Sequence, residues 1–233
     1  MKNILSLIVL VSLLSSCRFT SGSGDIVTSN RNTGDFKSVS AGGGFDVEIR
    51  TGSNYKVMVE ADDNLIDDIE TTVEGGQLKI RMRENLNVRN AHLKIFVTAP
   101  SITSIQSSAS ADIVVAGNLQ ADETIRIKAS SGSSIKASID APAAEADASS
   151  GAQIDINGRT RNFDVQASSG AAVDADKLLS ENTTAQSSSG GTADVHASVT
   201  LNARASSGGT VNYRGAATVV KKENSGGSIN KNN

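Results

Sequence analysis

Apolar and polar residues alternate along most of the chain, which is the two-residue period of β-strands with one buried face. The turn signals Thr51-Gly52-Ser53-Asn54 and Glu74-Gly75-Gly76-Gln77 separate such segments. Only residues 62–69 predict a helical turn, with Leu65, Ile66 and Ile69 on one side. Four alternating segments predict strands in the N-terminal half: Phe45/Val47/Ile49, Tyr55/Val57/Val59, Leu78/Ile80/Met82 and Leu93/Ile95/Val97.

A Ser-Ser-Gly unit repeats through the C-terminal half. A weaker copy at Ser108-Ala109-Ser110 precedes it, and from Ser110 the steps are 22, 19, 19, 20, 18 and 18 residues. The glycines are Gly132, Gly151, Gly170, Gly190, Gly208 and Gly226. Three positions after each unit an apolar residue follows: Ile113, Ile135, Ile154, Val173, Val211 and Ile229, with a shift to Val195 expected in the Gly190 copy.

This period predicts an all-β solenoid with about 18–22 residues per turn. Each turn is expected to hold two or three short strands, with the Ser-Ser-Gly unit at a corner. Glycine permits a positive φ there, and serine hydroxyls can satisfy turn amides. Ile135, Ile154 and Val173 are then predicted to stack inside the coil, while Lys136, Asp155 and Asp174 face solvent. A Ser/Gly linker would have no reason to place an apolar residue at a fixed offset.

The domain organisation follows from these patterns. Residues 31–230 are expected to form one solenoid domain, with an irregular strand-rich half at 31–100 and the repeat half at 101–230. Ala99-Pro100-Ser101 is the best internal boundary, although Ile102 and Ile105 already fit solenoid positions.

The N-terminus predicts export. Lys2 precedes an apolar run from Ile4 to Leu14, which is too short for a permanent transmembrane helix; a buried N-terminal helix is the alternative. Leu14-Ser15-Ser16-Cys17 resembles the lipobox of bacterial lipoproteins, which implies removal of residues 1–16 and a diacylglyceryl thioether on Cys17. Residues 17–30 are expected to form a flexible tether.

The residues after Cys17 bear on its destination. Arg18 stands where an aspartate would resemble an inner-membrane retention signal, so an outer-membrane lipoprotein is implied. No acidic cluster, typical of surface export in Bacteroidetes-like lipoproteins, occurs in residues 19–24. Which face of the membrane the protein occupies therefore stays open.

Several segments resemble one known family. They are F-K-S-V-S-A-G-G-G-F-D-V-E-I at 36–49, V-M-V-E-A-D-D-N at 57–64, G-G-Q-L-K-I at 75–80, Thr98-Ala99-Pro100, the S-S-G units and the final S-G-G-S-I. The chain resembles the DUF2807 or GIN-domain family of Bacteroidetes-type lipoproteins, described as "putative autotransporter adhesin head domains". The resemblance spans about residues 35–229 and implies a right-handed parallel β-helix-like fold. It identifies no functional residue.

The composition argues against nucleic-acid binding, disulfides and Cys/His metal sites. Aromatic residues make up 3% of the chain, Trp is absent and the formal charge is −3, so neither a stacking platform nor a basic stripe for nucleic acid is present. With 1 Cys and 2 His, the chain cannot form an internal disulfide or a Cys/His metal site.

Catalytic and metal-binding patterns are weak. Asp155 and Asp174 share one offset in adjacent turns, as in carboxylate pairs of glycan-active β-helices, but a Lys136/Asp155 surface pair explains the pattern better. His92 and His196 lack ligand spacing, and Gly190–Val195 only partly matches a calcium-binding repeat. We predict no catalytic residue, cofactor or metal site.

Two charged clusters remain as candidate binding surfaces. The segment 60–70 is densely acidic, and a solvated face explains it better than weak cation binding. Arg81, Arg83 and Arg89 are expected on the outward side of a strand, with a basic groove for an anionic glycan as the alternative.

The leading hypothesis is a non-enzymatic, lipid-anchored binding or adhesion module of the cell envelope. Its expected partners are the membrane, through the lipid, and a glycan or a protein of the envelope or host surface. A periplasm-facing structural or assembly lipoprotein is the alternative, and a β-helical glycan-active enzyme is a weaker third.

Overall fold

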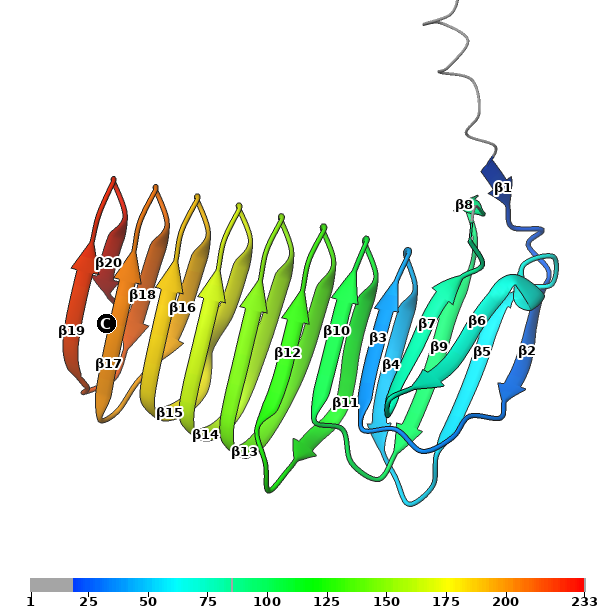
Figure 1. The fold of residues 1–233 in the computed structure, drawn as a ribbon, viewed down its shortest axis with the longest axis horizontal. Helices are drawn as coiled ribbons and strands as arrows, with labels where there is room; N and C mark the ends of the chain where they lie inside the picture. The colour runs from blue at the N-terminus through cyan, green and yellow to red at the C-terminus, as the bar shows by residue number, and fades with distance from the viewer. Residues whose placement is uncertain (1–18, 85, 233) are drawn as a thin grey trace, which may run out of the picture.

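The computed structural model describes residues 19–84 and 86–232, which form a β-solenoid of stacked coils (Figure 1). A single 3-10 turn, η1 (Ile66–Asp68), interrupts the strands of this part. The first nine strands are β1 (Phe19–Ser21), β2 (Ile26–Arg31), β3 (Ser38–Gly42), β4 (Asp46–Thr51), β5 (Lys56–Asp62), β6 (Ile69–Glu74), β7 (Gln77–Met82), β8 (Asn87–Arg89) and β9 (Leu93–Ala99). The others are β10 (Ser104–Ser108), β11 (Asp112–Gln120), β12 (Ile125–Ala129), β13 (Ser134–Ala148), β14 (Gln153–Ala167), β15 (Ala172–Ser187), β16 (Thr192–His196), β17 (Thr200–Ala205), β18 (Thr210–Arg214), β19 (Thr218–Glu223) and β20 (Ser228–Lys231).

Successive coils of the repeat half pair in parallel and in register. Ile135 pairs with Ile154, and Ile154 with Val173, and all three are buried. Lys136 and Asp174, which follow two of them, are exposed, and Asp155, which follows Ile154, is half-buried. The predicted inward stack is therefore confirmed, and from Ile113 to Ile229 it makes about six turns.

The coil at Gly190 departs from the prediction. Ala193, not Val195, occupies the inward column, where it pairs with Val173 and Val211. That turn is one residue longer, and its extra residue lies in β15, where the register of β14 and β15 shifts between Asp155 and Asn157. Hydrogen bonding between parallel strands fixes register residue by residue, so the column accepts a small alanine rather than sliding to a larger residue.

The strands are also longer than predicted. β13, β14 and β15 each run through 15 or 16 residues and continue around the bend opposite the Ser-Ser-Gly corner. At this bend Gly158 has a φ of 117°, and a side chain there would collide with the carbonyl of Ile139 in the preceding coil. The coils of β13, β14 and β15 thus each have one tight corner and one continuous bend, whereas the strand is interrupted at the bend between β16 and β17 and between β18 and β19.

The tight corner is a Ser-Gly turn with both residues in the left-handed region. Ser150 has a φ of 53° and Gly151 of 72°, and the six unit glycines have φ between 69° and 74°. The N–H of Gly151 donates to the carbonyl of Ser169 in the next coil at 3.1 Å, and the other turns repeat this bond. Main-chain bonds between coils therefore satisfy most corner amides, a role that the sequence assigned to serine hydroxyls.

Small residues flank the corner on both sheets. From residue 111 to residue 209, the two inward columns beside it contain Ala, Ser or Gly: Ala129, Ala148, Ala167, Ser187 and Ala205 on one side, and Ala111, Ser133, Ala152, Ala171, Gly191 and Gly209 on the other. A two-residue turn holds the sheets too close for larger side chains. The next inward column, farther from the corner, can hold Ile or Val. The core therefore widens away from the corner like a wedge, and small and medium-sized side chains fill it without many aromatic rings.

The stack extends into the N-terminal half. β3 and β4 pair in parallel with β10 and β11 on one side and with β7 and β9 on the other. The coil formed by β7 and β9 thus lies outside the coil formed by β3 and β4, although it comes later in the chain. The N-terminal half is less regular than the repeat half, as predicted: it consists of two coils and a cap, in which β5 and β6 run antiparallel to β9 and β7.

The segment predicted to be a flexible tether is ordered from Phe19 onward. β1 pairs with β8, and β2 pairs antiparallel with β5. Between them the carboxylate of Asp62 accepts the N–H of Gly24, and Ser23 donates its hydroxyl to Asp63. Cys17 and the predicted signal peptide lie outside the described residues.

Two charged side chains close the C-terminal end of the stack. Lys221 and Glu223 occupy columns that are inward in the preceding coil, where they pair with Ala203 and Ala205. Lys221 Nζ donates to the carbonyl of Ile229 at 3.1 Å, and Glu223 Oε1 accepts the N–H of Ile229 at 2.5 Å. Inward charges at an edge strand block further strand addition.

In the part of the chain that the structure describes, no helix is long and apolar enough to cross a bilayer.

Candidate functional site

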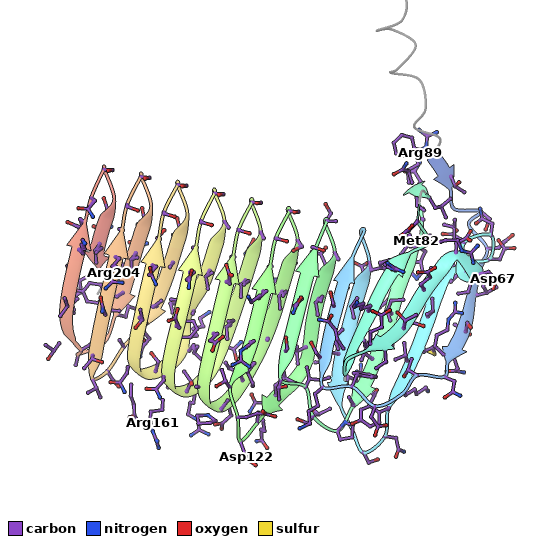
Figure 2. All side chains as sticks on the ribbon, in the orientation of Figure 1. Asp67, Met82, Arg89, Asp122, Arg161 and Arg204 are labelled. Carbon is purple, nitrogen blue, oxygen red and sulfur yellow. The ribbon has the colours of Figure 1, made fainter. Side chains whose placement is uncertain are left out.

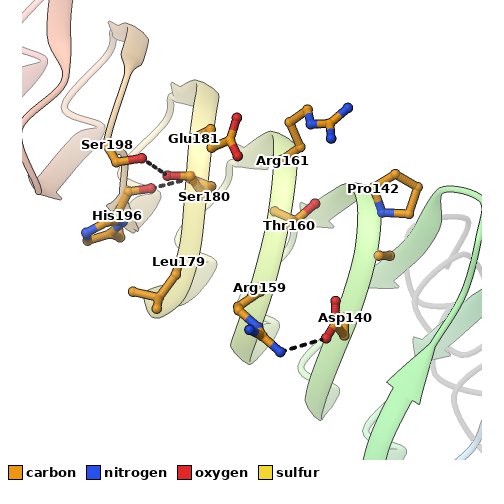
Figure 3. A pocket seen from close by; sticks show the side chains of 11 residues that line it. Asp140, Pro142, Arg159, Thr160, Arg161, Leu179, Ser180, Glu181, His196 and Ser198 are labelled. Atoms are coloured by element: carbon orange, nitrogen blue, oxygen red, sulfur yellow. Dashed lines mark hydrogen bonds and ion pairs between the residues drawn. The ribbon is translucent and has the colours of Figure 1, made fainter.

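An open groove of about 800 Å³ runs along the bend opposite the Ser-Gly corner (Figure 3). Its residues come from four successive coils, through β13, β14, β15 and the end of β16. The side chains that determine its chemistry are Asp140, Arg159, Arg161, Ser180, Glu181 and His196. They are far apart in sequence and adjacent only because the coils stack.

Register explains the ion pair in the groove. Asp140 and Arg159 pair across β13 and β14, and Arg159 Nη2 lies 3.1 Å from Asp140 Oδ2. Arg161 and Glu181 are both exposed on neighbouring strands. The groove thus carries two positive and two negative side chains, so its net charge selects neither a cationic nor an anionic ligand.

The hydroxyls of the groove hold the backbone in place. Ser180 is 2% exposed, and its hydroxyl donates to the carbonyl of His196 and contacts the Thr183 hydroxyl at 2.5 Å. Ser198 donates its hydroxyl to the carbonyl of Ser180 at 3.1 Å. The His196 ring points away from the Ser180 hydroxyl, and its Nδ1 is buried without a hydrogen-bond partner among the described residues. This serine and histidine do not form a nucleophile-base pair, which needs a direct hydrogen bond.

Polar side chains form continuous columns on the two outer faces (Figure 2). On the sheet that precedes the corner, Asn182 Nδ2 donates to Asn162 Oδ1 at 3.2 Å, and Thr200 Oγ1 donates to Asn182 Oδ1 at 2.8 Å. On the other sheet, Asn212 Nδ2 donates to Asp194 Oδ1 at 2.7 Å. These columns present amides and hydroxyls at the coil spacing of about 4.8 Å.

The predicted Asp155/Asp174 pair belongs to a longer acidic column. Asp155 pairs in register with Asp174, and Asp174 with Asp194. Partial burial raises the pKa of the Asp174 carboxyl, and the charges of Asp176, Asp155 and Asp194 raise it further. Lys136 is the register neighbour of Asp155, but no ion pair joins them within the described chain.

The acidic segment at 60–70 is largely engaged by other groups. Asp68 and Glu70 form ion pairs with Arg83 and Arg81 at 2.6 and 2.9 Å. Asp62 is buried, and the N–H groups of Gly24 and His92 lower the pKa of its carboxyl. Across the described residues, no three His, Cys, Asp or Glu side chains are grouped so that they could hold a metal ion.

The other sequence candidates lie apart. His92 contacts Glu60 at 2.7 Å on the N-terminal cap, whereas His196 lines the groove. Arg89 lies over the Phe19 ring at 5.7 Å, so the three arginines of the predicted basic groove are committed to separate contacts on the cap. The sequence patterns did not identify the groove residues as a site. Asp140 and Arg159 are separated by one repeat, and this spacing could have indicated that their side chains meet in the fold.

The comparisons with known proteins agree with this architecture. The family model described as "putative auto-transporter adhesin, head GIN domain", DUF2807, matches residues 35–217. The chain belongs to the DUF2807 family. The match confirms the resemblance and covers the two N-terminal coils and most of the repeat half.

Solved structures share the fold of this DUF2807 protein. A structure described as a "putative adhesin" from Bacteroides fragilis is 16% identical with a TM-score of 0.84, and the alignment covers 92% of this chain and 100% of that one. A "putative lipid binding protein" from Parabacteroides distasonis is 20% identical with a TM-score of 0.74, covering 93% and 100%. A "putative adhesin" from Parabacteroides merdae is 14% identical with a TM-score of 0.69, covering 92% and 99%.

No curated protein matches the chain. The family and its structural neighbours carry adhesin or lipid-binding descriptions, none of them enzymatic, and identities of this size establish the fold alone.

Proposed function

We propose that this DUF2807 protein is a lipid-anchored, non-enzymatic binding module of the bacterial outer membrane. The observation that carries the proposal is the repeated polar surface: columns of amides, hydroxyls and charges run along both faces of a long rod. Such a surface suits many shallow contacts with an extended ligand. The adhesin description of the family supports the same role.

The groove at the bend fits binding better than catalysis. It is open, its charges are balanced, and its serine and threonine hydroxyls are bonded to backbone carbonyls. We therefore assign the groove to ligand contact, with a glycan or a surface protein as the partner.

The anchor is the lipobox-like Leu14-Ser15-Ser16-Cys17. Two or more acyl chains on Cys17 would hold the protein stably, at about 0.8 kcal/mol per buried methylene. Because β1 begins two residues later and is paired with β8, a lipid on Cys17 would hold the cap close to the membrane.

Mass spectrometry of the membrane-extracted protein tests the anchor. We expect a diacylglyceryl-modified N-terminal Cys17, and we expect Cys17→Ser to release or mislocalise the protein. A soluble mature form that begins at another residue would refute it.

Protease shaving of intact cells tests display at the surface. We expect cleavage in intact cells if the module faces outward, with a periplasmic protein as the control for leakage. Full protection, with cleavage only after the outer membrane is opened, would instead support a periplasm-facing structural or assembly role. The absence of an acidic cluster in residues 19–24 favours that alternative.

A further inference from the structure

Positive charge is concentrated at the C-terminal end of the rod. Residues 200–233 include one acidic residue, Glu223, and five basic ones: Arg204, Arg214, Lys221, Lys222 and Lys231. The whole chain has a formal charge of −3, so the rest of it is acidic. In Figure 2 Arg204 lies at the opposite end of the rod from Arg89 and Asp67 on the N-terminal cap.

Elsewhere on the sheet that precedes the corner, outward cations are paired with a carboxylate of the next coil. Arg126 contacts Glu145 at 3.0 Å, and Lys128 lies 3.9 Å from Asp147. The two members of each pair are register neighbours on β12 and β13. Charge neutralisation between coils is thus the pattern of this face.

Arg204 and Lys222 break this pattern. They are register neighbours on β17 and β19, in the same column as Lys128 and Asp147. Both are exposed, and neither forms an ion pair within the described residues. Adjacent parallel strands lie about 4.8 Å apart. Two like charges at register neighbours on such strands repel each other, and a bound anion would relieve this repulsion.

Arg204 and Lys222 both line a cleft of about 340 Å³. Gln186, Ser188, Ser206 and Asn224 line it with amides and hydroxyls. We propose that this cleft binds an acidic polysaccharide, with Arg204 and Lys222 on a carboxylate or sulfate group and the amides and hydroxyls on sugar hydroxyls. Charge-assisted hydrogen bonds to such oxygens are about twice as strong as neutral ones.

The lining favours a glycan over other polyanions. It contains no aromatic side chain on which a base could stack and no large apolar side chain that could enter a bilayer. Its other end holds Asp147, whose carboxylate can accept hydrogen bonds from sugar hydroxyls. Lys221, in contrast, is committed to the Ile229 carbonyl and the Tyr213 ring.

This inference names a ligand class for the proposed binding role and rests on it. The experiment uses the purified chain without its lipid, so its result does not depend on where the protein is displayed. If the purified chain binds an acidic glycan but the protein resists protease shaving of intact cells, the cleft binds glycan without a role in surface adhesion. If shaving succeeds but no acidic glycan binds, only the proposal for the cleft is refuted.

Titrations with heparin and polygalacturonate oligosaccharides provide the test, because they distinguish sulfate from carboxylate. We expect binding of at least one, weakening with added NaCl. Lys222→Glu should weaken it by at least about tenfold, because it places a carboxylate beside Arg204 and restores the pairing seen at Arg126 and Glu145. Lys56→Glu, an equal charge change on the exposed face of the opposite end, should leave binding unchanged.

Neutral dextran, a single-stranded oligonucleotide and vesicles of phosphatidylcholine with phosphatidylglycerol serve as comparison ligands. Thermal unfolding of each variant checks that the fold is intact. No binding to either acidic glycan, equal loss in both charge variants, or binding to the oligonucleotide or vesicles as tight as to the glycans would each overturn the proposal.

Discussion

The carboxylate of Asp62 accepts a hydrogen bond of 2.7 Å from the backbone N–H of Gly24, and this bond fastens the N-terminal segment to the cap of the solenoid. The second oxygen of Asp62 accepts the N–H of His92, also at 2.7 Å. One buried side chain therefore joins the chain that follows Cys17 to the loop before β9. The described segment from Phe19 to Arg31 is part of the folded body.

Replacing Asp62 should release this segment. In Asp62→Asn, the amide nitrogen faces one of the two N–H donors, so we expect faster hydrogen exchange in residues 19–25. Because the pKa of Asp62 is lowered by these bonds, its stabilisation is complete above the unfolded value of 3.8 and is lost as pH falls through the lower folded value. Asp67→Asn, an exposed change on the adjacent 3-10 turn, is the control; equal exchange in both variants would contradict the clamp.

The inward column should dominate stability. Ile154 is fully buried between Ile135 and Val173, so Ile154→Ala removes buried methyl groups and leaves a cavity, at about 2–4 kcal/mol. Chemical denaturation measures the loss. Gln153→Ala, one position earlier and exposed, should change the free energy of unfolding little. The register would be wrong if the two changes had similar effects.

The later coils should reject a methyl group beside the corner. A Cβ on Gly209 would lie 2.6 Å from the Ser187 carbonyl carbon and the Ser188 amide nitrogen, both rigid backbone atoms. We expect Gly209→Ala to lower the free energy of unfolding by about 1–3 kcal/mol. Gly34→Ala has open space around the new Cβ and should be nearly neutral in the same thermal or denaturant assay. An unchanged melting temperature for Gly209→Ala would show that the coils can separate there.

Neutralising the acidic column should stabilise the protein. The folded pKa of Asp174 is raised, so its ionisation opposes folding: stability falls as pH rises from the unfolded value of 3.8 through the raised value, and stays reduced at neutral pH. Asp174→Asn should therefore raise the melting temperature at neutral pH and flatten its pH dependence. Asp122→Asn makes the same charge change away from the column, and a similar gain there would indicate a net-charge effect instead.

Removing the inward charges at the C-terminal end should expose a usable strand edge. The double change Lys221→Ala and Glu223→Ala gives the last coil the same inward residues as Ala203 and Ala205. We expect concentration-dependent self-association by light scattering, because an unblocked edge strand adds further strands. Lys222→Ala, the outward neighbour, should stay in the wild-type oligomeric state. If the double variant also keeps that state, the two charges do not guard the edge.

The sequence by itself determined the solenoid, its period and its inward stack. A Ser-Ser-Gly unit at a nearly constant step leaves few conformations other than a stacked coil, and an apolar residue at a fixed offset gives the inward face. It also predicted the strands of the N-terminal half, because a two-residue alternation is local information.

Only the tertiary structure decided how coils that are distant in sequence meet. It placed residues 77–99 outside residues 38–51, fixed Ala193 rather than Val195 in the inward column, and made Asp62 the anchor of the segment expected to be free. The groove at Asp140 and Arg159 and the unpaired cations at Arg204 and Lys222 arise in the same way. Contacts between coils depend on the register of the hydrogen bonds between parallel strands. One inserted residue or one bulge changes this register, and the alternation of apolar and polar residues along a single strand does not reveal it.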